Sequence, residues 1–279
     1  MICQCISPSL EFRDFIREYL VIHLTFENNV APPAKVYPVN PEEGIRFIVR
    51  GSLVSENPES GIIEKRPTVS IFGQPKSREN LFISHEYLMI HVRFQPGGLF
   101  KLLGIPMTEL IHQNYEAQLI LGQEIIEVQE QLTESKSYNE MLAILNNYFR
   151  SKFSTLKLNN QPIDKIGLSI LKKPQEFNLE KTAGDACLSY RQFEKRFVRL
   201  IGITPKYYAR VCRFYQAYEL KEFQPKLDWL SIAMRTGYND YQHLAKDFKQ
   251  FAGTTPNSLI RESLSNPERR FNITSNFVL

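Results

Sequence analysis

The 279-residue sequence lacks a hydrophobic run long enough to cross a membrane, and its first residues lack the apolar core of a signal peptide. We therefore predict a cytoplasmic protein without a membrane partner. Its four cysteines are too few and too scattered for a disulfide framework. Cys3 and Cys5 lie close together, but no second pair of Cys or His at ligand spacing follows them, so free thiols are expected.

Signatures of catalysis and of bound cofactors are also missing. The sequence contains no Gly-rich phosphate-binding loop and no nucleophile elbow. Its five histidines are dispersed and include no His-x-His pair of the kind that holds a metal in cupin enzymes. We therefore expect no metal, no cofactor and no catalytic residue, which means that the chain is not an enzyme.

Charge is distributed unevenly along the chain. Residues 164–279 carry 19 Lys and Arg against 12 Asp and Glu, a net charge of +7. Residues 1–163 carry 15 against 18, a net charge of −3. A basic C-terminal half attached to a mildly acidic N-terminal half favours a polyanion as the partner of the C-terminal half only.

The most informative feature is an internal repeat in the basic half. When residues 189–210 are laid over residues 240–261, seven of the 22 aligned pairs are identical. Only two copies occur, whereas a solenoid needs three or more, so a duplicated small module is the better interpretation. Ser189 and Asp240 are suited to cap the start of a helix, and Gly202 and Gly253 are suited to end it.

Each capped helix is preceded by a shorter helical segment, at Leu179–Ala186 and at Leu230–Thr236, and by a tight connection. A helix, a short turn and a second helix form a helix-turn-helix unit. Residues 204–223 between the two units read as one helix of roughly 27 Å. A strut of that length could hold two recognition helices about one DNA turn apart, roughly 34 Å.

The face opposite the apolar stripe is polar and basic in both copies. It carries Arg191, Lys195 and Arg199 in the first copy and Gln242, Lys246, Lys249 and Gln250 in the second. Arg and Lys can read guanine edges, and Gln can read adenine, from a helix in the major groove. Many amphipathic helices carry a solvated face of this kind, but its repetition in the basic half favours DNA binding.

Residues 163–265 resemble the AraC/XylS class of bacterial transcriptional regulators. The second unit carries the most specific matches, which are Ile232-Ala233, Gly237-Tyr238, Phe248-Lys249 and Gly253-x-Thr255-Pro256. The resemblance implies a seven-helix domain whose third and sixth helices enter adjacent segments of the major groove. Ala186 departs from the pattern because the family usually has a glycine in the first turn.

By position, the resemblance assigns base reading to Arg191, Glu194 and Lys195 in the first unit and to Tyr241, Gln242, Ala245 and Lys246 in the second. Together with the polar faces, the predicted DNA-binding set is Arg191, Gln192, Glu194, Lys195, Arg199, Tyr241, Gln242, Ala245, Lys246 and Lys249.

The N-terminal half combines β-like runs with later helical patterns. The runs are Tyr19–Phe26, Ile45–Val49, Val69–Phe72 and Leu88–Phe94, and the helical patterns are Leu99–Leu103, Gln123–Thr133 and Tyr138–Phe153. The motif Arg93-Phe94-Gln95-Pro96-Gly97-Gly98 resembles regulator domains with a cupin-like core. A small-molecule effector could bind there, and its candidate contacts lie on or next to predicted strands: Tyr37, Arg46, Phe47, His91 and Arg93.

The expected fold class is α+β. A cupin-like β domain with flanking helices spans residues 1–155, an all-α domain of two helix-turn-helix units joined by a long helix spans 160–265, and 266–279 form a tail. The expected partners are double-stranded DNA, RNA polymerase, a small-molecule effector and a second copy of the chain. The apolar stripes of residues 125–132 and 141–149 could pair between chains or pack on their own domain. The alternative function is a metal-dependent cupin enzyme fused to a DNA-targeting module.

Overall fold

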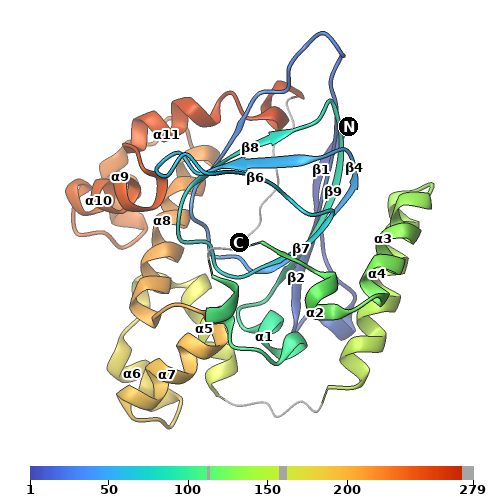
Figure 1. The fold of residues 1–279 in the computed structure, drawn as a ribbon. Helices are drawn as coiled ribbons and strands as arrows, with labels where there is room; N and C mark the ends of the chain where they lie inside the picture. The colour runs from blue at the N-terminus through green and yellow to red at the C-terminus, as the bar shows by residue number, and fades with distance from the viewer. Residues whose placement is uncertain (112–113, 157–161, 272–279) are drawn as a thin grey trace.

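The computed structural model describes residues 1–111, 114–156 and 162–271. Figure 1 shows two sheets and a helical hairpin built by the N-terminal half, and a group of helices built by the C-terminal half. The predicted α+β class, with a β-sheet domain followed by an all-α domain, is confirmed. No helix in these residues is long and apolar enough to span a bilayer.

The N-terminal part contains two antiparallel sheets. The six-stranded sheet has the order β1 (Ile2–Ile6), β2 (Ile16–Thr25), β9 (Glu86–Phe94), β4 (Gly44–Arg50), β7 (Val69–Phe72) and β10 (Tyr115–Glu116). The four-stranded sheet has the order β3 (Lys35–Tyr37), β8 (Glu79–Ile83), β5 (Leu53–Glu56) and β6 (Ile63–Lys65). The four strands expected from the sequence are β2, β4, β7 and β9, the better-buried strands of the larger sheet.

Side chains of the larger sheet alternate between two apolar layers, as the pleat of a strand requires. On one face Phe47 and Ile90 pack toward helices α3 (Glu124–Glu134) and α4 (Tyr138–Ser154). On the other face Leu20 and Met89 pack toward the smaller sheet. Pairing in register places Leu20 and Arg46 on either side of His91, so the inner face combines apolar and polar positions.

Helices α3 (Glu124–Glu134) and α4 (Tyr138–Ser154) form a hairpin on the outer face of the larger sheet (Figure 1). Their apolar stripes, which suggested pairing between chains, are buried within this chain against each other and against the sheet. These stripes therefore give no support to a homodimer. The shorter helices of this part are α1 (Gly98–Leu103), α2 (Gln118–Leu121) and the 3-10 turns η1 (Leu10–Phe12) and η2 (Met107–Leu110).

The C-terminal part contains seven α-helices between residues 163 and 263. They are α5 (Ile163–Lys172), α6 (Leu179–Asp185), α7 (Tyr190–Ile201), α8 (Pro205–Phe223), α9 (Trp229–Arg235), α10 (Tyr241–Ala252) and α11 (Pro256–Ser263), with a 3-10 turn η3 (Pro174–Glu176) after α5. One core joins α5, α6, α7 and the first half of α8, and a second joins the rest of α8 to α9, α10 and α11. The long helix α8 therefore belongs to both units and fixes one against the other.

The two parts of the chain are bound together at several points. The backbone N–H of Val39 donates to the carbonyl of Phe251 at 3.0 Å. Arg78 pairs with Glu262 of α11 at 2.5 Å. The segment predicted as a tail continues this contact, because Pro267–Phe271 form a 3-10 turn, η4, and Asn266 and Glu268 are buried against the N-terminal part. Residues 272–279 of that tail lie outside the described residues.

Candidate nucleic-acid interface and interdomain cavity

Local capping defines the two candidate recognition helices. At the start of α7 the backbone N–H of Gln192 donates to Oγ of Ser189 at 3.4 Å, and Oε1 of Gln192 accepts from the Ser189 N–H at 3.2 Å. At the start of α10, Oδ1 of Asp240 accepts from the His243 N–H at 2.8 Å. Gly202 and Gly253 end the helices with left-handed backbones, at φ values of 92° and 67°.

The turns inside the two units differ in length. Four residues separate α6 from α7, whereas five separate α9 from α10. The left-handed residue of the first turn is Cys187, with φ of 55°, and its counterpart in the second is Gly237, with φ of 79°. Ala186 has an ordinary helical φ of −82°. The position equivalent to Gly237 is therefore occupied by Cys187 and not by Ala186, and the repeat offset changes from 50 to 51 residues within the turn.

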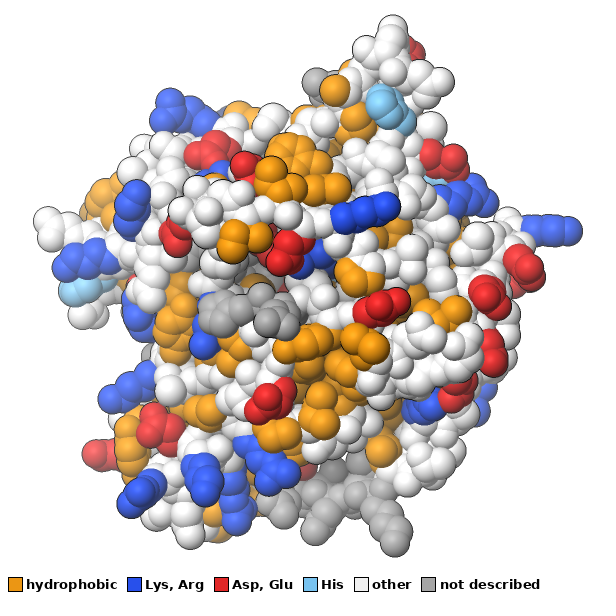
Figure 2. Space-filling model, in the orientation of Figure 1, with side chains coloured by type: hydrophobic (Ala, Val, Ile, Leu, Met, Phe, Trp, Pro, Cys, Tyr) orange, Lys and Arg blue, Asp and Glu red, His pale blue; other side chains and the backbone are white. Residues whose placement is uncertain are grey.

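Both helices present their predicted contact residues to solvent. Phe193 and Phe197 of α7, and Leu244 and Phe248 of α10, are fully buried. The opposite face of each helix is polar, with Glu194 and Ala245 half-buried and the other predicted contact residues exposed. Figure 2 shows Lys and Arg side chains gathered at lower left, where Figure 1 places α6 and α7.

Two of the ten predicted residues lie at the far ends of the helices and make contacts within the chain. The guanidinium of Arg199 lies 5.6 Å from the ring centroid of Phe100 in α1. Nζ of Lys249 donates to the carbonyl of Gly253 at 3.1 Å. The remaining eight lie in the first two turns of α7 and α10. DNA contact by the ten residues remains a prediction.

A buried polar cluster that the sequence analysis missed supports α10. The hydroxyl of Tyr238 donates to Oδ2 of Asp247 at 3.0 Å, and Arg210 of α8 donates to Oδ1 of the same residue at 2.6 Å. The guanidinium of Arg213 lies 4.7 Å from the ring centroid of Tyr238. The cluster joins the turn, the recognition helix and α8, so it fixes the orientation of α10.

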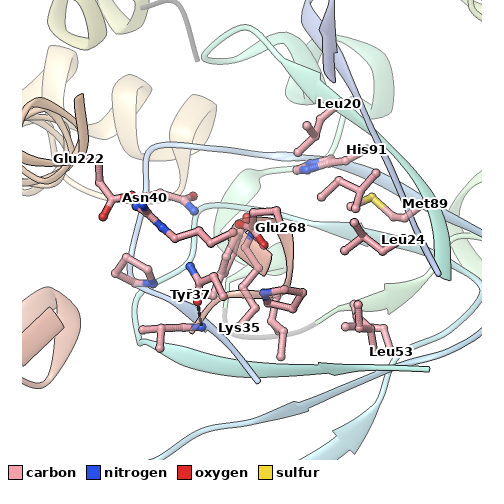
Figure 3. A pocket seen from close by; sticks show the side chains of 18 of the residues that line it. Leu20, Leu24, Lys35, Tyr37, Asn40, Leu53, Met89, His91, Glu222 and Glu268 are labelled. Carbon is pink, nitrogen blue, oxygen red and sulfur yellow. Dashed lines mark hydrogen bonds and ion pairs between the residues drawn. The ribbon is translucent and has the colours of Figure 1, made fainter. Parts of the chain in front are cut away.

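A cavity of about 330 Å³ lies between the two sheets, and helix α8 and turn η4 also line it (Figure 3). Leu20, Leu24 and Met89 form an apolar wall from the larger sheet, and Leu53 and Leu81 form another from the smaller sheet. Tyr215, Tyr218 and Glu219 of α8 complete it from the C-terminal part. The cavity is therefore built by both parts of the chain.

Two buried arginines at the polar side of this cavity differ in their partners. Arg93 is paired with Glu18 at 2.8 Å and with Glu42 at 3.0 Å. Arg46 is 5% exposed, and within the described residues no carboxylate lies within ion-pair distance of its guanidinium, which stands 4.7 Å from the ring centroid of Phe72. Arg46 is therefore a buried cation that has no anionic partner in the described part of the chain.

Other polar atoms of the cavity also have open hydrogen-bonding capacity. Nε2 of His91 and Oδ1 of Asn40 are buried and have no hydrogen-bond partner among the described residues. Burial, together with the positive charges of Arg93 and Arg46, lowers the pKa of His91 well below its ordinary value, so its ring is neutral. The residue paired in register with Arg46 on the neighbouring strand β9 is therefore a neutral imidazole.

Four of the five residues predicted to contact an effector line this cavity: Tyr37, Arg46, His91 and Arg93. Phe47 does not, because it follows Arg46 on β4 and its side chain points to the opposite face, where it is 0% exposed in the core. Within the described residues, no three His, Cys, Asp or Glu side chains are grouped so as to hold a metal ion.

Turn η4 forms the side of the cavity that faces the C-terminal part (Figure 3). Nζ of Lys35 lies 2.5 Å from Oε1 of Glu268. The backbone N–H of Val36 donates to Oδ1 of Asn266 at 2.9 Å, and Arg269 is paired with Glu222 of α8. Residues about 230 positions apart meet here, so the sequence contained no local signal for this part of the site.

Two separate segments of the chain match known protein families. Residues 182–262 match a helix-turn-helix domain, and residues 4–116 match a domain of unknown function (DUF6597). No curated protein matches the chain.

Several solved structures match the chain. ToxT from Vibrio cholerae is 12% identical, with 90% of this chain and 98% of that one covered and a TM-score of 0.46. A structure of wild-type ToxT with bound unsaturated fatty acid is 14% identical, with 87% and 94% covered and a TM-score of 0.45. The DNA-binding domain of AdpA, a global transcriptional factor, in complex with target DNA is 23% identical, with 38% and 96% covered and a TM-score of 0.35.

Proposed function

We propose that this chain is a DNA-binding transcription regulator of the AraC type, in which α7 and α10 enter two successive major-groove segments of one duplex. Residues 182–262, which match a helix-turn-helix domain, support this function. We further propose that an amphipathic anion bound in the interdomain cavity controls this binding.

The paired recognition helices support the DNA-binding proposal. Each helix buries one apolar face and exposes its first two turns, with Arg191 and Lys195 on α7 and Gln242 and Lys246 on α10. Helix α8 has 19 residues and spans about 28 Å, close to the rise of one DNA turn. One chain can therefore present both helices to one side of a duplex.

Footprinting with the full chain tests this arrangement. Lys195→Ala and Lys246→Ala should each weaken binding, and each should reduce the dependence of affinity on salt because fewer counterions are released. Arg191→Ala should cost about 1–3 kcal/mol on the preferred site and relax base preference at one position. Lys136→Ala removes an exposed cation from the connection between α3 and α4 and should leave affinity unchanged. Protection of a single groove segment would show that only one unit binds DNA.

The effector proposal rests on the guanidinium of Arg46, which has no carboxylate partner among the described residues. An isolated buried charge is unfavourable, and a ligand carboxylate would neutralise it while the leucine-rich walls hold an alkyl or aryl group. The cavity volume lies at the lower end of the range of small-molecule sites, about 300–1,000 Å³. The class of ligand that fits best is therefore a medium-sized organic acid with an apolar body.

Calorimetric titration with decanoate and with decanol tests this ligand class. Decanoate should bind the full chain, and Arg46→Gln should weaken its binding at least tenfold while leaving decanol unaffected. Arg50→Gln is the matched control, because Arg50 lies on the same strand but is half-exposed and paired with Glu86. Equal affinity of the wild type and Arg46→Gln for decanoate would rule out Arg46 as the anion site. Footprints with and without decanoate then measure its effect on DNA binding.

A further inference from the structure

Glu268 places a carboxylate inside the proposed effector cavity. It belongs to η4 at the end of the C-terminal part, yet it reaches Lys35 of β3, and the two side chains are 11% and 20% exposed. Figure 3 shows Glu268 among the cavity-lining side chains. A carboxylate held by a buried cation next to apolar walls has the same chemistry as the head group of the proposed ligand.

Lys35 and Arg46 both line the cavity, so both positive charges attract an anion that enters it. Among the described residues Arg46 has no carboxylate partner, whereas Lys35 is paired with Glu268. When the carboxylate of Glu268 leaves the cavity, it regains its hydration in water. The ligand carboxylate takes its place beside Lys35, so Lys35 remains paired with one anion.

The position of Glu268 connects this exchange to the second DNA-binding unit. Only Leu264 and Ser265 separate α11 from Asn266, whose Oδ1 accepts the Val36 N–H at 2.9 Å. Helix α11 packs on α10 in the second core. Release of Glu268 would loosen residues 266–269 from β3 and, through α11, reduce the attachment of the second unit to the N-terminal part.

We propose that Glu268 is an internal competitor of the effector, which the anionic group of the ligand replaces on Lys35 so that residues 266–269 leave the cavity. The proposal rests on the cavity being the effector site. It makes Glu268 a determinant of ligand affinity and a link between the cavity and the second unit.

The test compares Glu268→Gln with the wild type, both as full chains, in titrations with decanoate and decanol. Gln keeps the size of the side chain but removes the charge that competes for Lys35, so decanoate should bind about tenfold more tightly and decanol equally well. The matched control is Glu262→Gln, because Glu262 also pairs with the N-terminal part, through Arg78 at 2.5 Å, but does not line the cavity. It should leave decanoate affinity unchanged.

Hydrogen exchange of the β3 segment is the second measurement, since Asn266 protects the Val36 amide. Decanoate should accelerate exchange there severalfold in the wild type, and Glu268→Gln should do so without ligand. If Arg46→Gln weakens decanoate binding but Glu268→Gln does not strengthen it, the competitor is ruled out and the effector site stands. If Arg46→Gln has no effect but Glu268→Gln gains affinity, the Arg46 site fails and the competitor stands. If no chain binds decanoate, both are wrong.

Discussion

The hydroxyl of Tyr238 donates a 3.0 Å hydrogen bond to Oδ2 of Asp247, and this bond joins the turn of the second helix-turn-helix unit to its recognition helix. The same carboxylate accepts from Arg210 of α8. The orientation of α10 therefore depends on a carboxylate that is itself 5% exposed and does not face the proposed DNA surface.

Asp247→Ala should lower the free energy of unfolding by about 2–3 kcal/mol, because it leaves the buried Tyr238 hydroxyl without an acceptor. Tyr238→Phe removes the donor and should cost about 1 kcal/mol. Both changes should also weaken DNA binding, although neither residue is a predicted contact. Urea denaturation and footprinting measure these effects, with the exposed Tyr241→Phe as the control for stability. An Asp247→Ala chain with unchanged stability would contradict the role of this cluster.

Glu43 predicts a pH dependence of stability. Burial raises the pKa of Glu43 to about 8 from 4.5, despite the N–H of Leu99 that donates to its carboxyl at 3.1 Å. Between these pH values the folded chain keeps a proton that the unfolded chain releases, so stability present below pH 4.5 is lost as pH rises through about 8.

Glu43→Gln should remove this part of the pH dependence and stabilise the chain at pH 8.5 relative to the wild type, by on the order of 2–4 kcal/mol. Urea denaturation at pH 5 and pH 8.5 measures the difference. Burial also raises the pKa of Glu219 to about 7, so Glu219 contributes to the pH dependence of both proteins. The difference between their unfolding free energies at each pH isolates the contribution of Glu43. If the free energy of unfolding changed with pH by the same amount in both proteins, the raised pKa of Glu43 would be contradicted.

Alanine substitutions at two helical glycines, Gly167 and Gly184, test how tightly α5 packs on the N-terminal part of the chain. A methyl group on Gly167 of α5 would lie 2.6 Å from Cβ of Pro96, whereas a methyl group on Gly184 of α6 would meet nothing within 4 Å. Gly184→Ala should stabilise the chain by about 0.5–1 kcal/mol through helix propensity. Gly167→Ala should destabilise it by about 1–3 kcal/mol, because α5 must move away from Pro96. Equal changes in unfolding free energy would show that α5 adjusts freely.

The features that the sequence predicted correctly are those encoded locally. The caps at Ser189, Asp240, Gly202 and Gly253 fix the ends of α7 and α10 because their hydrogen bonds join residues three or four positions apart. The one-residue difference between the two turns was missed because Cys187 adopts a backbone that usually selects glycine.

The cavity could be anticipated only in part. Arg46, His91 and Arg93 lie on long strands whose alternation is visible in the sequence, but alternation does not say which face of a two-sided sheet lines a cavity, so Phe47 was included. Lys35 and Glu268 could not be paired in advance, because their contact depends on how β3 packs against residues about 230 positions later in the chain.

The two buried arginines of the cavity should respond oppositely to the same substitution. Arg93→Met leaves the buried carboxylates of Glu18 and Glu42 without their cation, so it should destabilise the chain by about 3–5 kcal/mol.

Arg46→Met instead removes a buried cation that has no carboxylate partner in the described part of the chain, and a flexible apolar side chain can fill its place. The lost interaction with Phe72 is worth about 2 kcal/mol or less, whereas the penalty for burying an unpaired charge amounts to several kcal/mol. Arg46→Met should therefore raise the free energy of unfolding, by about 1–3 kcal/mol, in the absence of ligand. Added decanoate should stabilise the wild type and not this variant, since only the wild type has a cation for the carboxylate. Thermal denaturation with and without decanoate measures both effects. A less stable Arg46→Met chain would mean that Arg46 serves the fold, and that a ligand anion is not needed to explain its burial.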